Sequence, residues 1–177
     1  RLRARLSLAS RARVSRKEGI AVSTSVLFVC LGNICRSPLA EAAFREVARR
    51  GGLPVLVDSA GTGNWHAGQS PDHRAQAVAL DNGIDISAYR ARQIEKADFA
   101  RFDHIIALDN TNLAELKTLR GGRSKARLSL MLDHVPGRKG HGVADPYYGD
   151  ADGFRATWDD VWMASEALLA SLKSGAI

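Results

Sequence analysis

The sequence predicts an α/β fold in a single domain, built on a four-stranded parallel sheet with helices on both faces. Short apolar runs alternate along the chain with segments of helical periodicity, which is typical of strands joined by crossover helices. One run, residues 104–108, has an entirely apolar centre, as expected for a strand buried on both faces. The length of 177 residues and the 45% share of hydrophobic residues suit one domain with a substantial core.

The first part of the chain supplies two strands and the helix between them. Residues 25–30 form an apolar run and predict the first strand. Ser37 is expected to cap the next helix, with Pro38 in the first helical position, and an apolar face recurs as far as residue 50. A Gly-Gly pair ends this helix, and residues 54–59 then predict the second strand.

The remaining elements continue the alternation. A Ser-Pro pair opens a helix over residues 70–82, which an Asn-Gly pair ends. The buried strand at 104–108 is followed by a helix over 110–119, and residues 128–132 predict a short fourth strand. A long amphipathic helix over 153–172 is the last expected element. Folds of this kind bind ligands beyond the carboxyl ends of their strands.

Basic residues are concentrated at the start of the chain. Residues 1–20 hold seven of the 25 Lys and Arg residues and one acidic residue, so the rest carries 18 basic and 18 acidic residues. We therefore predict a disordered, Arg-rich extension over residues 1–22 and a folded domain over 23–177. The composition of the extension also fits a transit peptide, and a start site further along the chain is a third interpretation. Because the excess charge belongs to the extension, no nucleic-acid partner is predicted, and no apolar run predicts a membrane span.

The segment from Cys30 to Ser37, Cys-Leu-Gly-Asn-Ile-Cys-Arg-Ser, is the most informative in the chain. It joins the first strand to a helix, and such a loop directs backbone N–H groups inward to form a cradle for a phosphate-sized anion. Arg36 can hold two oxygens of that anion with its planar guanidinium. The same positive field favours the thiolate of Cys30, which would be placed for nucleophilic attack on the bound phosphate.

A second informative stretch, Asp-Pro-Tyr-Tyr, begins at Asp145. Hydrolysis of a phosphate ester needs an acid for the leaving oxygen and then a base for the attacking water, and one carboxyl group can serve both steps in turn. Asp145 is the candidate for this role, and Tyr147 and Tyr148 are expected to form an aromatic slot above the cradle. Without the cradle, the motif would be interpreted as an ordinary Asp-Pro turn.

With these motifs the chain resembles the low-molecular-weight protein-tyrosine phosphatases. The resemblance rests on residues 29–37, on the Asp-Pro-Tyr-Tyr motif, and on the segments 58–61, 92–94 and 102–109. It covers about residues 25–172. It implies that family's fold and the hydrolysis of protein phosphotyrosine and aryl phosphates, through a covalent cysteinyl-phosphate and without a metal or cofactor.

The resemblance also implies roles for the catalytic and pocket residues. Cys30 attacks phosphorus, Arg36 binds the phosphoryl oxygens and the transition state, and Asp145 protonates the phenolate before it activates water. The other residues that it implies around the phosphate and the substrate ring are the loop residues Leu31, Gly32 and Ile34 and the pocket residues Trp65, Tyr147 and Tyr148.

The resemblance also implies that a further group of residues supports the loop. Asn33, with help from Ser59, holds an unusual backbone shape, and Ser37 offers its hydroxyl to the sulfur of the nucleophile. Cys35 resembles the partner in a reversible disulfide that protects the nucleophile from further oxidation. Some members of the family have a His at the position of Tyr89, so part of the polar network behind the loop is expected to differ.

Three other functions remain open. An arsenate reductase shares the fold and the loop, but its chemistry needs further cysteines, and this chain has only Cys30 and Cys35. A phosphoarginine phosphatase is similar but tends to carry Thr where this chain has Ile34, and an apolar Ile favours a flat aromatic substrate. A non-catalytic phosphate-binding module would be expected to have lost the thiol or the acid, and the sequence has both.

The expected partners are proteins that carry phosphotyrosine, with a tyrosine kinase as a further candidate. We expect a monomer or a weak dimer. Because both cysteines lie in one loop, no disulfide framework is predicted elsewhere, which suits a cytoplasmic location. No cofactor is predicted, and the five histidines lack the paired spacing of metal ligands, so no metal site is predicted either.

Overall fold

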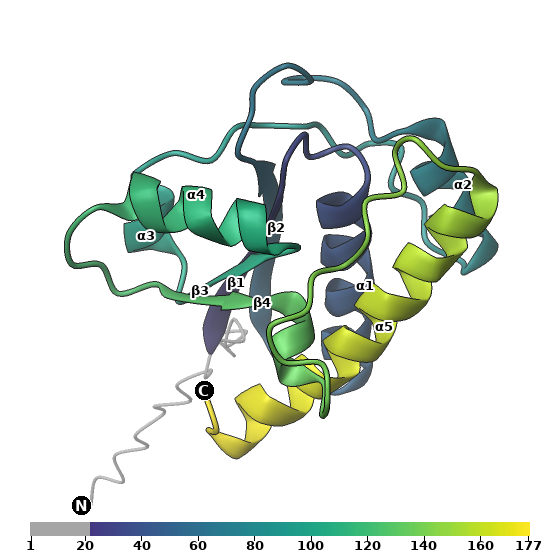
Figure 1. The fold of residues 1–177 in the computed structure, drawn as a ribbon. Helices are drawn as coiled ribbons and strands as arrows, with labels where there is room; N and C mark the ends of the chain where they lie inside the picture. The colour runs from purple at the N-terminus through teal and green to yellow at the C-terminus, as the bar shows by residue number, and fades with distance from the viewer. Residues whose placement is uncertain (1–21) are drawn as a thin grey trace, which may run out of the picture.

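The computed structural model describes residues 22–177. The extension predicted for residues 1–22 therefore falls, apart from Val22, outside the described residues. Four parallel strands form one sheet in the order β2-β1-β3-β4 (Figure 1). The strands are β1 (Thr24–Cys30), β2 (Val55–Gly61), β3 (His104–Ala107) and β4 (Arg127–Leu130). The predicted α/β class and the four-stranded parallel sheet are confirmed.

Helices cover both faces of the sheet, as predicted (Figure 1). One face is covered by α1 (Arg36–Arg50), α2 (His73–Asp81) and α5 (Ala151–Ser174), and the other by α3 (Asp98–Arg101) and α4 (Asn110–Arg120). Side chains of β1 alternate between the two cores, with Phe28 in the first and Leu27 in the second. Because β1 lies between β2 and β3, its last residue, Cys30, reaches the middle of the edge where the parallel strands end.

The fourth strand is shorter than predicted. β4 ends at Leu130, and a short 3₁₀ helix, η1 (Met131–His134), replaces the predicted strand over residues 131–132. The carboxylate of Asp133 accepts a hydrogen bond from the backbone N–H of Leu130 at 3.1 Å, which favours a turn in place of sheet pairing. The apolar side chains of Met131 and Leu132 belong to the core on the α5 side, so their burial does not need a strand.

Side-chain caps move two helix starts away from the predicted positions. α2 begins three residues later than predicted because Asp72 caps it, accepting a hydrogen bond from the N–H of Arg74 at 2.8 Å. α5 begins two residues earlier because Asp150 accepts hydrogen bonds from two N–H groups of its first turn. The sequence also missed α3, a single turn whose Asp98 is fully buried. Within residues 22–177, every helix is too short or too polar to cross a membrane.

The start of α1 corrects the role predicted for Ser37. The helix begins at Arg36, and the residue before it is Cys35, whose side chain makes no capping hydrogen bond. Pro38 is consequently the third helical residue rather than the first. The Ser37 hydroxyl points into the protein and lies 3.0 Å from the sulfur of Cys30, so this residue serves the interior of the loop rather than the helix end.

Candidate active site

The loop between β1 and α1 encloses a pocket at the carboxyl edge of the sheet. Cys30 stands at its base with 3% of its surface exposed, and its sulfur contacts the Ser37 hydroxyl. The N-terminus of α1 follows the loop directly, so its unpaired backbone N–H groups carry partial positive charge beside the pocket. This end of the pocket therefore favours an anion.

The backbone of the loop is held in shape by Asn33. This residue has φ of 55°, and among residues 22–177 it is the only non-glycine residue in the left-handed region. Its amide nitrogen donates to the hydroxyls of Ser37 and Ser59 at 2.8 and 2.9 Å, and its amide oxygen accepts from the backbone N–H of Arg92 at 3.0 Å. One side chain thus joins the start of α1, the strand β2 and the segment before α3.

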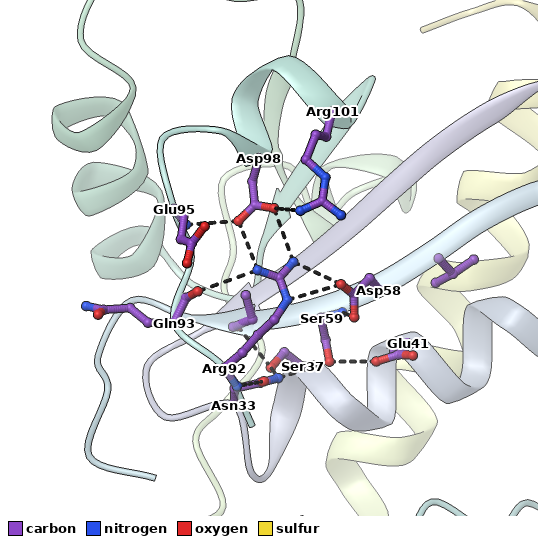
Figure 2. Close-up of polar contacts among 12 residues, drawn as sticks. Asn33, Ser37, Glu41, Asp58, Ser59, Arg92, Gln93, Glu95, Asp98 and Arg101 are labelled. Atoms are coloured by element: carbon purple, nitrogen blue, oxygen red, sulfur yellow. Dashed lines mark hydrogen bonds and ion pairs between the residues drawn. The ribbon is translucent and has the colours of Figure 1, made fainter. Parts of the chain in front are cut away.

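The network continues behind the loop through acidic residues for which the sequence analysis predicted no role (Figure 2). The Ser59 hydroxyl donates to the carboxylate of Glu41 at 2.6 Å. Burial raises the pKa of Glu41, although hydrogen bonds from Ser59 and Arg45 act in the opposite direction. The guanidinium of Arg92 lies between Asp58 and the fully buried Asp98, at 2.9 Å from each (Figure 2).

Tyr89 lies behind the same loop. It lines a cavity of about 100 Å³ together with Asn33, Glu41 and Ser59. The hydrogen bonds of Asn33 and Ser59 run to the partners described above rather than to Tyr89. Burial and the charge of Glu41 raise the pKa of the Tyr89 hydroxyl, so this position stays neutral where a His could become charged.

Arg36 is buried beneath the pocket and bonds to two separate loops. Its Nη1 donates to Asp109 Oδ2 at 2.6 Å and to the carbonyl oxygen of Val143 at 3.1 Å, and its Nη2 donates to Asp145 Oδ2 at 3.1 Å. Burial opposes the charge on Arg36, but Cys30, Asp109 and Asp145 outweigh it and raise the pKa of the guanidinium. A permanent cation therefore lies at the base of the pocket.

Asp145 lies on a loop that a second arginine attaches to α2. Arg74 donates to both oxygens of its neighbour Asp72 at 3.0 and 2.9 Å, which orients the guanidinium. From there it donates to the carbonyl oxygens of Tyr147 and Gly149, each at 3.0 Å, and its guanidinium lies 4.5 Å from the ring centroid of Phe154. The loop that carries the carboxyl group is thus fixed from outside the pocket.

These groups surround one pocket with a volume of about 210 Å³. Ten of the predicted site residues line it: Cys30, Leu31, Gly32, Ile34, Cys35, Arg36, Trp65, Asp145, Tyr147 and Tyr148. The other three, Asn33, Ser37 and Ser59, lie behind the loop and reach the pocket only through their hydrogen bonds.

Aromatic side chains form the mouth of the pocket. Trp65 is 68% exposed, and its ring lies against Gly63, where a Cβ would come within 1.8 Å of the indole. The rings of Tyr147 and Tyr148 meet edge to face with centroids 4.9 Å apart. His66 also lines the mouth and was missed by the sequence analysis; its Nδ1 lies 2.9 Å from Gln69 Oε1.

Comparison with known proteins identifies the family. A family model described as low molecular weight phosphotyrosine protein phosphatase matches residues 25–176. The chain belongs to this family. It is 40% identical over 151 residues to the low molecular weight protein-tyrosine-phosphatase YfkJ of Bacillus subtilis, an alignment that covers 84% of this chain and 96% of that protein. The family predicted from the motifs is confirmed, and the chain is a phosphatase.

Solved structures of other phosphatases have the same fold. A protein tyrosine phosphatase from Entamoeba histolytica superposes with a TM-score of 0.82 at 38% identity, covering 88% of this chain and all of that one. A Drosophila arginine phosphatase superposes with a TM-score of 0.79 at 32% identity, covering 84% of this chain and 97% of that one. The fold is therefore shared by enzymes named for two different phosphorylated residues.

The two cysteines of this phosphatase have different surroundings. Both are free and buried, and both line the pocket. Burial, with the charge of Asp72 as a smaller cause, raises the pKa of the Cys35 thiol far above its ordinary value. Cys35 therefore remains protonated at neutral pH. The sulfur of Cys30 differs in its contacts, because the hydroxyl of Ser37 lies against it.

The structure also adds two residues that the motifs did not indicate as parts of this site, Asp109 and Arg74. Asp109 follows β3 and caps α4 by accepting a hydrogen bond from the N–H of Asn112 at 2.8 Å, while its other oxygen holds Arg36. An acidic residue directly after a buried strand was a possible signal for Asp109, because parallel strands end at a common edge. Nothing in the local sequence around Arg74 points to the Asp145 loop.

Proposed function

We propose that this phosphatase hydrolyses phosphotyrosine in proteins, and small aryl phosphates, through a covalent phosphocysteine on Cys30. One observation carries the proposal. A thiol, a buried cation and a carboxyl group from two distant parts of the chain line one narrow pocket with aromatic walls. The remainder of the family scheme follows from the chemistry that these groups can perform on a phosphate monoester.

In the first step the Cys30 thiolate attacks phosphorus. The S–P bond forms as the bond from phosphorus to the phenolic oxygen breaks, and protonated Asp145 gives its proton to that oxygen. Arg36 and the backbone N–H groups of the loop hold the three phosphoryl oxygens, on which charge is spread in the transition state. The phenol then leaves with its proton.

In the second step Asp145, now a carboxylate, takes a proton from water. The water oxygen attacks phosphorus, the S–P bond breaks, and inorganic phosphate leaves with the thiolate of Cys30 restored. The Ser37 hydroxyl, 3.0 Å from the sulfur, stabilises this thiolate as the leaving group. The scheme uses no metal and no cofactor.

Phosphoarginine is a second candidate substrate, because the arginine phosphatase from Drosophila has the same fold. The side chain of Ile34 argues against it. This apolar residue lines the pocket and can pack against a flat phenyl ring, whereas it offers no hydrogen-bond acceptor to the guanidinium of phosphoarginine. Arsenate reduction is disfavoured because Cys30 and Cys35 are the only cysteines in the sequence.

We assign this activity to residues 23–177 and propose phosphotyrosine proteins as its partners, with the kinases that phosphorylate them as its natural counterparts. A cytoplasmic location would keep Cys30 and Cys35 reduced. A monomer suffices for the proposed chemistry, because one chain supplies the thiol, the cation and the carboxyl group.

The test is phosphate release from a phosphotyrosine peptide in excess chelator, with Cys30→Ser measured in parallel. We expect release by the wild type and none by the variant, because a serine hydroxyl is a far weaker nucleophile than a thiolate at neutral pH. A phosphoarginine peptide of the same sequence is the comparison substrate. If phosphate is released from the phosphoarginine peptide only, the assignment to phosphotyrosine is wrong and phosphoarginine becomes the assigned substrate. Activity in Cys30→Ser would refute the covalent scheme.

A further inference from the structure

A second groove adjoins the catalytic pocket. The two share one wall, formed by Leu31 of the loop and the indole of Trp65, so they are continuous across these side chains. The groove has a volume of about 410 Å³, roughly twice that of the catalytic pocket. The sequence analysis did not predict it, and the proposed chemistry does not use it.

The floor of this groove is apolar. Ile94 and Leu116 are 5% and 0% exposed, and the half-buried Leu119 continues the floor along α4. One wall is fixed by a side-chain hydrogen bond, because Gln93 Nε2 donates to the carbonyl oxygen of Thr62 at 2.9 Å. A large apolar side chain would bury its surface against the side chains of Ile94, Leu116 and Leu119, which are all apolar.

The rim of the groove carries one negative charge. Glu115 is exposed on α4, and within residues 22–177 its carboxylate takes part in no ion pair. Glu115 lines the groove and not the catalytic pocket, so its carboxylate at the rim favours a cation that lies beyond an apolar group on the floor.

We propose that the groove binds the residues next to phosphotyrosine in the substrate protein: a large apolar side chain on its floor and a Lys or Arg against Glu115. This inference rests on the proposed function and names the substrate class of the same site. Its basis is continuity, because Leu31 and Trp65 border both the catalytic pocket and the groove, so a chain whose phosphotyrosine enters the pocket can continue across them into the groove. Exposed Leu31, at 42%, offers an apolar surface to the segment that crosses between the two.

The experiment uses fluorescence anisotropy to compare the affinities of phosphotyrosine peptides for the Cys30→Ser protein, which we expect to bind them without releasing phosphate. One peptide has Leu beside the phosphotyrosine and Lys beyond it, a second replaces that Lys by Glu, and a third replaces the Leu by Gly. We expect the Leu peptide to bind at least about tenfold more tightly than the Gly peptide. The Lys peptide should bind about threefold to fivefold more tightly than the Glu peptide, with the difference lost at high salt.

Two charge reversals locate the effect. Adding Glu115→Lys should invert the preference between the Lys and Glu peptides, whereas Glu166→Lys, the same change on α5 on the other side of the sheet, should leave it unaltered. Neither reversal in the wild-type background should change turnover of 4-nitrophenyl phosphate, which is too small to reach the groove. Equal affinities for the three peptides, or equal effects of the two reversals, would refute the proposal that the groove binds the residues next to phosphotyrosine. Absence of 4-nitrophenyl phosphate turnover by the wild type would refute the proposed function itself.

Discussion

The pocket has two regions that are built in contrasting ways: an inner wall, which is the Cys30–Ser37 loop together with the buried side chains behind it, and an aromatic mouth. On the inner wall, Asn33 is 3% exposed and makes three hydrogen bonds to three separate parts of the chain. At the mouth, Tyr148 is 96% exposed and contacts the ring of Tyr147. The loop at the base is therefore held in one conformation by the fold, because its hydrogen bonds are shielded from water. The exposed side chains of the mouth can adapt to the substrate at little cost in the stability of the protein.

The largest effect is expected where the two regions meet, at Asp145. Asp145→Asn keeps the size of the side chain but removes the proton donor, so turnover of esters with poor leaving groups should fall by about 10²–10⁴. Esters of acidic phenols, which leave without protonation, should lose much less. A leaving-group series with Asp152→Asn, the same change at the start of α5, as control checks this. Equal losses for all esters would remove Asp145 as the acid.

Two substitutions at Asn33 separate the hydrogen bonds of the inner wall from its backbone shape. Both Asn33→Gly and Asn33→Ala lose the buried hydrogen bonds, and we expect each to lower the free energy of unfolding by about 1–3 kcal/mol. Asn33→Ala should lose about 1–2 kcal/mol more, because glycine alone tolerates the φ of 55° without strain. Urea denaturation of the two proteins gives the difference. If the two variants are equally stable, backbone strain contributes nothing at this position.

A substitution at Arg74 tests whether the mouth depends on the hydrogen bonds of this single side chain. Arg74→Gln removes the donors to the carbonyl oxygens of Tyr147 and Gly149, so the carboxyl of Asp145 should be held less firmly. We expect turnover to fall about tenfold for poor leaving groups, with less effect on activated esters, which corresponds to the loss of one or two net hydrogen bonds. Arg155→Gln, at an exposed position of α5, is the matched control. A uniform loss for all esters would indicate a structural role only.

The smallest effect is expected at Tyr148. Tyr148→Ala removes an exposed ring from the mouth, so KM for a phosphotyrosine peptide should rise severalfold while kcat is unchanged. The free energy of unfolding should change by no more than about 0.5 kcal/mol, as for most surface substitutions. Tyr148→Phe, which keeps the ring, should restore KM in steady-state assays. A loss of kcat in Tyr148→Ala would contradict the division between inner wall and mouth.

The order of strands and helices was predictable because it follows from local patterns in the sequence. Alternating apolar runs and helical faces identified the sheet and four of its helices, and the chain order of Cys30 and Arg36 already placed a thiol and a guanidinium in one loop. Boundaries were predicted less well. Whether Leu132 belongs to a strand or a 3₁₀ helix depends on the carboxylate of Asp133 and on burial beneath α5, which periodicity does not report.

The sequence by itself thus determined the fold class, the family and which side chains the loop carries, because each depends on residues that are neighbours along the chain. Only the tertiary structure decided which groups surround that loop. Asp109, 73 residues from Arg36, holds its guanidinium, and Arg74 reaches the loop of Asp145 from another helix. Those contacts exist because parallel strands end at one edge of the sheet and bring distant loops together there, and no local pattern records which distant side chains then meet.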